Sequence, residues 1–136
     1  MREALLDTDT ISYFFRGENS VIEKVDQYLI EFGQLNISVV TFYEVMNGLL
    51  FKDARKQLEK FQEFVRLNIV LPLTSEAALK AAQIYAELRK NGEVIGHIDV
   101  LIAGIALEND LVLVTNNNKD FGRIQGLKID NWSSPK

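Results

Sequence analysis

The residues that most constrain the fold are Ala4–Leu6, an apolar run that ends directly at Asp7. Such a run without a polar break is typical of a strand buried on both faces of a parallel sheet. Burying an unpaired carboxylate is costly, or it raises the pKa of the group until the group is neutral. At the carboxyl end of a strand in an open α/β sheet that cost has a use, because ligands bind in the crevice there. We therefore expect Asp7 to lie on the floor of a functional site.

Strands and helices alternate along the rest of the chain. We expect strands at residues 4–6, 35–40, 68–73, 111–115 and 127–129. We expect helices at residues 8–16, 20–32, 41–51, 53–67, 75–90 and 98–108, with a short helical piece after the turn at 116–118. This alternation predicts a three-layer α/β/α fold with a central parallel sheet, helices on both faces and right-handed crossovers.

Composition narrows the class of protein and the kinds of site. A chain of 136 residues is long enough for one domain with a sizeable core. The absence of cysteine excludes disulfides, thiolate zinc sites and cysteine nucleophiles, and fits a cytoplasmic location. No apolar run approaches a membrane span, and the first residues do not have the layout of a signal peptide. The net charge of -4 gives no general attraction to nucleic acid, so a polyanion has to be held by local basic groups or by metal ions.

Four acids from separate stretches are expected at one edge of the sheet. Asp7 ends the first strand, and Glu44 lies in the first turn of the helix after the second strand. Asp99 lies in the first turn of the helix that leads into strand 111–115, and Asp120 follows that strand. Crowded carboxylates raise each other's pKa values, so such a cluster needs a cation. Oxygen ligands without His or Cys predict Mg²⁺ or Mn²⁺.

Each acid also has a simpler explanation. Glu44 stands three residues after Thr41, which is the spacing of a capping box. Asp99 could complement a helix dipole, Asp120 could be a solvated loop acid, and Asp9 could be a turn residue. These explanations do not account for the gathering of acids at one edge of the sheet. The only histidine, His97, is expected in a loop, where an ordinary exposed or hydrogen-bonded role is favoured over catalysis.

Four segments resemble the acidic motifs of PIN-domain ribonucleases. They are Leu5–Ile11, Thr41–Glu44, Asp99–Ala103 and Thr115–Phe121. Their order, their spacing and the length of the chain are most similar to a VapC-type toxin of a prokaryotic toxin–antitoxin pair. The resemblance implies a single PIN-like nuclease domain over residues 1–136.

The resemblance also implies roles for individual residues. Asp7, Glu44, Asp99 and Asp120 would hold one or two Mg²⁺ or Mn²⁺ ions, with Thr115, Asn117 and Asp9 in supporting positions. Such a site activates water for attack on an RNA phosphodiester bond. The implied partners are an RNA substrate, an antitoxin protein that covers the acidic edge, and a second copy of the chain in a homodimer. Two residues depart from the family pattern: Asn117 stands where many relatives carry another acid, and Gly104 replaces the usual alanine.

Two other functions remain open at this point. Asp7 and Asp9 match the two acids of the phosphatase motif of haloacid-dehalogenase-like enzymes, in which the first Asp is phosphorylated. That motif requires a threonine where this chain has Ile11, and it requires a later lysine and a paired-acid motif that are not convincingly present. The second alternative is a PIN-like module that binds RNA or protein without catalysis. Intact acids argue against it, because carboxylates without chemistry would repel RNA.

Overall fold

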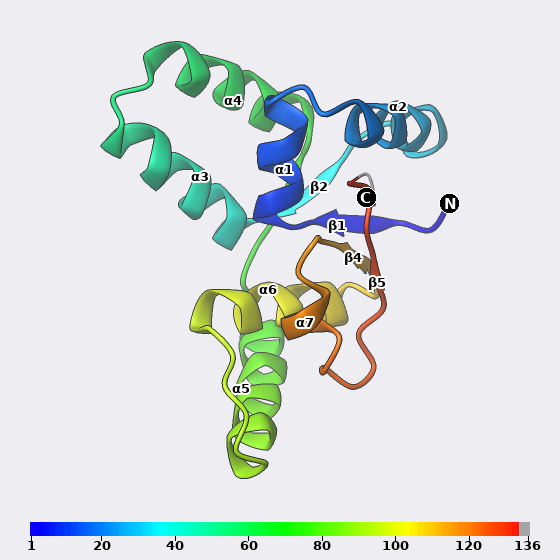
Figure 1. The fold of residues 1–136 in the computed structure, drawn as a ribbon, viewed down its shortest axis with the longest axis vertical. Helices are drawn as coiled ribbons and strands as arrows, with labels where there is room; N and C mark the ends of the chain where they lie inside the picture. The colour runs from blue at the N-terminus through cyan, green and yellow to red at the C-terminus, as the bar shows by residue number, and fades with distance from the viewer. Residues whose placement is uncertain (134–136) are drawn as a thin grey trace.

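Strand β1 (Ala4–Leu6) lies in the middle of the sheet in the computed structural model, which describes residues 1–133 (Figure 1). The other strands are β2 (Asn36–Ser38), β3 (Ile69–Leu71), β4 (Val112–Val114) and β5 (Ile129–Asp130). Backbone hydrogen bonds join β1 to β4, β4 to β5 and β2 to β3, and every pair is parallel. The predicted central parallel sheet is therefore confirmed.

Side chains, rather than a backbone ladder, join β2 to β1. Asn36 Nδ2 donates to the backbone oxygen of Ala4 at 3.0 Å, and the backbone N–H of Ala4 donates to the hydroxyl of Tyr28 at 3.0 Å. The two strands lie side by side (Figure 1), so the spatial order of the strands is β3-β2-β1-β4-β5. The sequence did not predict that backbone hydrogen bonds between β1 and β2 are absent, because the bonds that replace them depend on a tyrosine from a neighbouring helix.

The strand order places a topological switch point between β1 and β4. From β1 the chain moves outward through β2 to β3, and it then returns to form β4 on the opposite side of β1. Crossovers on the two sides of the switch point leave a crevice outside the carboxyl ends of the two strands. Asp7 follows β1 and Thr115 follows β4, so both residues stand at this crevice.

The helices cover both faces of the sheet (Figure 1). They are α1 (Thr8–Phe15), α2 (Asn19–Phe32), α3 (Val39–Phe51), α4 (Arg55–Leu67), α5 (Ser75–Lys90), α6 (His97–Glu108) and α7 (Asn118–Phe121). Helices α1 to α4 lie on one side of the sheet, and α5, α6 and α7 lie on the other. The three-layer α/β/α arrangement is thus confirmed. No helix within residues 1–133 is long and apolar enough to cross a membrane.

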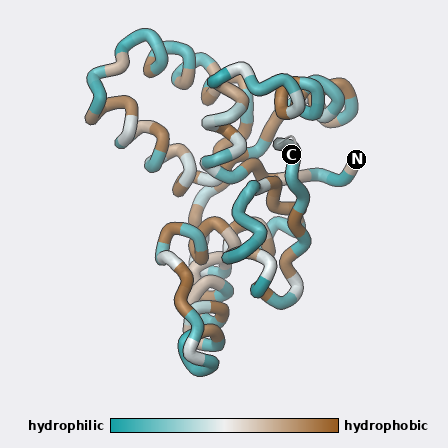
Figure 2. The backbone as a smooth tube through the Cα atoms, in the orientation of Figure 1, coloured by the Kyte–Doolittle hydropathy of each residue, from teal (hydrophilic) through white to brown (hydrophobic). Residues whose placement is uncertain are grey.

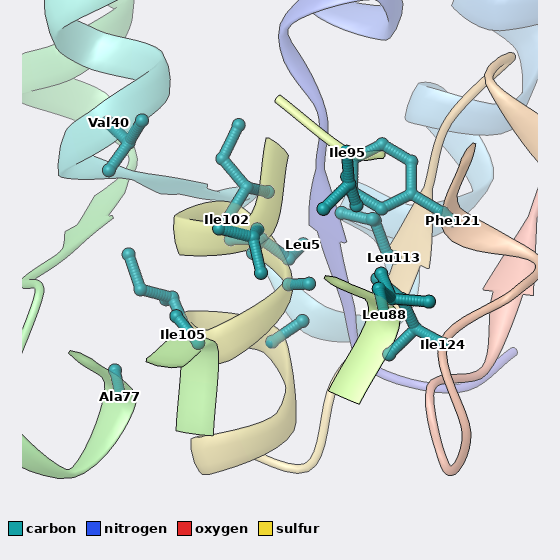
Figure 3. Packing of buried hydrophobic residues seen from close by; sticks show 14 residues of the cluster. Leu5, Val40, Ala77, Leu88, Ile95, Ile102, Ile105, Leu113, Phe121 and Ile124 are labelled. Atoms are coloured by element: carbon teal, nitrogen blue, oxygen red, sulfur yellow. The ribbon is translucent and has the colours of Figure 1, made fainter. Parts of the chain in front are cut away.

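Alternating residues of the central strands point to opposite faces of the sheet and pack into two hydrophobic cores. Leu5 and Leu113 pack with residues of α5 and α6, such as Ala77 of α5 and Ile102 of α6 (Figure 3). Leu6 and its neighbours pack on the other face, against α1, α2 and α4. Figure 2 shows the same pattern, with hydrophobic residues along the strands and α6. Because side chains of a strand alternate between faces, an unbroken apolar run is what a doubly covered strand needs.

Helix α3 begins earlier than the sequence predicted. Val39 and Val40 are β-branched and favour a strand, so the strand was expected to continue to residue 40. In the structure Ser38 is the N-cap, and its Oγ accepts the backbone N–H of Thr41 at 3.0 Å. The cap satisfies a free N–H of the first helical turn and therefore fixes the start of the helix at Val39. Helix α6 also begins one residue early, because it includes His97, which was expected in a loop. Helix α5 covers the expected residues, and Thr74 is its N-cap.

Gly104 gives a test of the contact between α5 and α6. A Cβ atom at Gly104 would lie 2.4 Å from the backbone oxygen of Ala77, so this packing has no room for a side chain. We predict that Gly104→Ala lowers the free energy of unfolding by about 1–3 kcal/mol, as overpacking does in other cores. The matched control is Gly48→Ala in α3, where a Cβ would meet nothing within 4 Å. That change should raise stability by up to about 1 kcal/mol through helix propensity. Urea unfolding measures both, and equal effects would contradict the packing argument.

Candidate active site

Asp7 is buried at the junction of β1 and α1. The residue is only 5% exposed, and its Oδ2 accepts a hydrogen bond from Thr115 Oγ1 at 2.8 Å. Burial, followed by repulsion from Asp9, raises the pKa of Asp7 to about 7, although the bond from Thr115 acts in the opposite direction. Asp7 therefore has the environment expected of a carboxyl group on the floor of a site.

Glu44 faces α1 instead of capping its own helix. It lies in the second turn of α3, not the first as predicted, because the helix begins two residues earlier than expected. Its Oε1 accepts a hydrogen bond from Thr8 Oγ1 at 2.5 Å, and Thr8 Oγ1 also lies 3.0 Å from the hydroxyl oxygen of Thr41. Ser38 occupies the cap position, so the capping-box explanation of Glu44 is wrong.

Asp99 lies in the first turn of α6, as predicted, and is half-buried. Burial is the main cause that raises its pKa, and repulsion from Asp120, Glu44 and Asp9 raises it further. These three acids come from α7, α3 and α1, so the structure brings the acids of four separate segments around the start of α6. An acid that only complemented a helix dipole would be stabilised in its charged form. The pKa of Asp99 is raised instead, first by burial and then by the neighbouring acids.

Asp120 lies in α7 and is held by two residues of its own segment. Asn117 is the N-cap of α7: its Oδ1 accepts the backbone N–H of Asp120, and its Nδ2 donates to Asp120 Oδ2 at 3.1 Å. Arg123 forms an ion pair with Asp120 Oδ1 at 3.2 Å. Asp120 is therefore not the solvated loop acid of the simpler explanation.

Asp9 and Thr115 tie the turn after β4 to α1. Asp9 Oδ2 accepts the backbone N–H of Asn116 at 3.0 Å. Thr115 Oγ1, which donates to Asp7, also accepts the backbone N–H of Asn117 at 3.0 Å. The structure thus places Asp9, Thr115 and Asn117 next to the acids that they were expected to support.

Sequence reasoning missed three residues that hold the acids in place. Thr8 orients Glu44, Ser38 sets the start of α3, and Arg123 pairs with Asp120. Only the third had a local signal, because an acid and an arginine three residues apart meet on one side of a helical turn. His97 packs away from this set: its ring stacks on Tyr85 of α5 with 4.7 Å between ring centroids.

The donor set of the acidic site fits a hard divalent cation. The converging side chains offer carboxylate oxygens, and Asp7 and Asp99 both have raised pKa values that a nearby cation would lower. Within residues 1–133, no three His, Asp or Glu side chains stand close enough together to enclose an ion by themselves. Mg²⁺ is commonly held by one or two carboxylates and keeps several water molecules. The chemistry of the donors therefore favours Mg²⁺ or Mn²⁺ over zinc.

Comparison with known proteins gives a family match over most of the chain. The family model described as PIN domain matches residues 4–127. A tRNA(fMet)-specific endonuclease VapC of Shigella flexneri is 31% identical over 134 residues, which cover 98% of this chain and 100% of that protein. The protein of the same name from Salmonella typhimurium is 32% identical and covers 97% of this chain and 99% of its own length.

Solved structures give the same result. The DNA-bound VapBC of Salmonella typhimurium has a TM-score of 0.87 and 31% identity, with 97% of this chain and 99% of that chain covered. A VapBC complex of Rickettsia felis bound to a promoter DNA fragment has a TM-score of 0.88 and 25% identity, with 96% and 98% covered. These similarities extend over all four acidic segments.

The pKa of Asp7 gives a pH-dependent prediction for the metal-free protein. Between the unfolded value of 3.8 and the folded value of about 7, the folded state retains a proton that the unfolded state has lost. Stability should therefore fall as pH rises through this window and stay low above it. Asp7→Asn keeps an oxygen that can accept the bond from Thr115, but it cannot ionise. We predict that the variant gains on the order of 2–4 kcal/mol relative to wild type between about pH 4 and pH 8.

Chemical unfolding across this pH range, with chelator present, measures the difference. Asp26→Asn, at an exposed position of α2, is the matched control and should follow wild type at every pH. Parallel curves for wild type and Asp7→Asn would contradict the burial and repulsion assigned to Asp7.

Proposed function

The chain belongs to the PIN-domain family, and from this premise we propose that it is an endoribonuclease that acts as the toxin of a toxin–antitoxin pair. The observation that carries the proposal is the convergence of acids from four separate segments at the switch point of the sheet. Relatives that match over nearly the whole chain are named as VapC endonucleases. Similar solved structures are described as VapBC bound to DNA.

We assign a role in the site to each of the four converging acids. Asp7 and Asp99 would hold Mg²⁺ or Mn²⁺, with Glu44 and Asp120 completing the acidic site. A divalent ion supplies water activation and offsets charge on the phosphate oxygens when it is bound. Thr115 keeps Asp7 in its orientation through the 2.8 Å bond to Oδ2. Thr8 engages Oε1 of Glu44, which leaves the other carboxylate oxygen of Glu44 to orient the attacking water.

The substrate class that suits this site is single-stranded or looped RNA, whose unpaired bases and accessible backbone can reach an open edge. The acids repel RNA without a cation, so phosphates need basic groups nearby. Arg16, Lys52, Lys56 and Lys60 line a groove between α1, α3 and α4. Because the relatives of Shigella flexneri and Salmonella typhimurium are named tRNA(fMet)-specific, initiator tRNA is the first substrate to test. A cytoplasmic location is part of this proposal.

The two alternative functions are less well supported. A phosphatase of the haloacid-dehalogenase type needs Asp9 as a mobile acid and base, whereas Asp9 is bonded to the backbone of Asn116. The family match and the similar structures also favour the nuclease. A purely binding module would gain nothing from acids with raised pKa values.

Cleavage assays test the proposal. Purified protein should cut initiator tRNA or another structured RNA with Mg²⁺ or Mn²⁺ and lose this activity with chelator. Asp7→Asn, Glu44→Gln and Asp99→Asn should each lower the cleavage rate by at least about 100-fold, because each removes a charge that serves the ion or the water. Asp26→Asn should cleave at the wild-type rate.

A second measurement tests the metal site without RNA, so it remains informative when the chosen RNA is not a substrate. Mn²⁺ should raise the melting temperature of wild type by mass action and raise that of Asp99→Asn much less. Turnover of a generic phosphomonoester through phosphorylated Asp7, with all RNAs intact, would refute the nuclease and support the phosphatase.

A groove between α1, α3 and α4 is suitable for the antitoxin partner. The groove has a volume of about 570 Å³, and its floor contains Ile11, Phe15 and Phe61. Its basic rim consists of Arg16, Lys52, Lys56 and Lys60. This combination fits an amphipathic peptide with apolar side chains toward the floor and acidic ones toward the rim. A basic residue of the same partner could then enter the acidic site and offset its charge.

A homodimer completes the proposed assembly. Helix α3 leaves Val39, Tyr43 and Leu50 exposed along one side, and Phe51 at its end is 89% exposed. Figure 2 shows this hydrophobic end of α3 at the edge of the molecule. Exposed apolar side chains grouped on one helix are typical of a protein interface.

The groove can be tested by the binding of the protein that the adjacent gene encodes. The dimer can be tested with the free chain. The double variant Lys56→Glu/Lys60→Glu should weaken binding by at least about 10-fold, because like charges would face each other at the rim. Lys24→Glu, at an exposed position of α2, is the charge-matched control and should bind like wild type. Calorimetry measures affinity, and light scattering should show a dimer of the free chain. Equal binding by both variants would refute the groove, and a monomer would refute the dimer.

A further inference from the structure

Arg123 connects the acidic site to the segment that precedes α6. Its Nη2 donates to the backbone oxygen of Val94 at 2.7 Å and to Asp120 Oδ1 at 3.2 Å. Its Nε donates to the backbone oxygen of Asp120 at 3.3 Å, and its Nη1 pairs with Glu93 Oε1 at 3.4 Å. The side chain is 26% exposed. Four hydrogen bonds from one guanidinium hold it in a fixed position at the edge of the site.

Both carboxylate oxygens of Asp120 already have donors. Arg123 donates to Oδ1, and Asn117 Nδ2 donates to Oδ2 at 3.1 Å. Asp120 still lies near enough to Asp99 to be the charged neighbour with the largest effect on Asp99. Asp120 therefore contacts the guanidinium of Arg123 and is also a charged neighbour of the acid at the start of α6.

A second divalent ion would have to bind beside this guanidinium. Repulsion between a divalent ion and a fixed positive charge a few ångströms away opposes such binding. The neighbouring side chain of Asn117 is a neutral amide, and its Nδ2 donates to Asp120 Oδ2. Arg123 supplies one fixed positive charge at the place where that ion would bind, and it shares this charge between Asp120 and Glu93.

We infer that Arg123 takes the place of a second metal ion, so that the site binds one divalent ion and Asp120 acts as a positioning residue paired with Arg123. This differs from the ligand role that the sequence suggested for Asp120. The ion is held by Asp7 and Asp99, while the pair of Asp120 and Arg123 fixes α7 against the segment that leads into α6. The inference rests on the proposed function, since it concerns the ion of that site.

Counting bound Mn²⁺ by calorimetry and by the electron paramagnetic resonance signal of free Mn²⁺ tests the inference without RNA. Wild type should bind one Mn²⁺ per chain. Asp120→Asn should also bind one, with its affinity lowered by less than about 10-fold, whereas Asp99→Asn should lose more than about 10-fold. Two ions on wild type, or a loss of affinity in Asp120→Asn as large as in Asp99→Asn, would overturn the inference.

Two substitutions of Arg123 separate its charge from its shape. Arg123→Met removes the charge and frees Asp120, so the stoichiometry should rise toward two, and a value that stays at one would overturn the inference. Arg123→Lys retains a positive charge and should stay at one. If Arg123→Met does not fold, the counts for wild type and Asp120→Asn still decide the question. Absence of any Mn²⁺ binding to wild type would instead refute the metal site of the proposed function, and the inference with it.

Discussion

The hydrogen bond between Thr115 and Asp7 joins the ends of the two strands at the switch point. Asp7 is buried, and its backbone N–H donates to Val114 while Thr115 Oγ1 donates to its side chain. Thr10 adds a bond to the same backbone oxygen of Val114 at 3.1 Å. The start of α1 and the turn after β4 therefore depend on one cluster of contacts around a carboxyl group. A fold selected for stability alone would have an apolar residue at this position, since burial of a carboxyl group opposes its ionisation.

The acids are held mainly by neutral donors. Threonine hydroxyls orient Asp7 and Glu44 without supplying positive charge, so the negative charge of both groups remains available to a cation. Asp99 is the acid on which the repulsion from the other segments converges. Such repulsion destabilises the free protein, and a bound ion or a basic partner relieves it. A ligand that binds only the folded state adds stability, so the protein can keep these acids together. The same electrostatics thus link catalysis to inhibition by a partner.

Local patterns were sufficient to predict the sheet, its three-layer arrangement and the segments that carry the acids. The unbroken apolar runs at β1 and β4 and the buried character of α6 carry that information directly. They were not sufficient for the start of α3, where the cap by Ser38 outweighs the strand propensity of two valines. Nor could they reveal the contact of Asn36 and Tyr28 with β1, which depends on the packing of α2 against the sheet. Pairings between distant segments are set by the tertiary fold.

The contrast between Asp7 and Asp120 shows how one site can treat chemically equivalent acids differently. Asp7 is buried and meets a hydroxyl, so its charge is disfavoured until a cation arrives. Asp120 is 34% exposed and meets a guanidinium, so its charge is satisfied by the protein itself. Their position at the acidic site alone would suggest the same role for both residues. Their hydrogen-bond partners give them different roles. Asp7, which has neutral donors, can bind an ion, whereas Asp120, which has a charged donor, holds the surrounding segments in place.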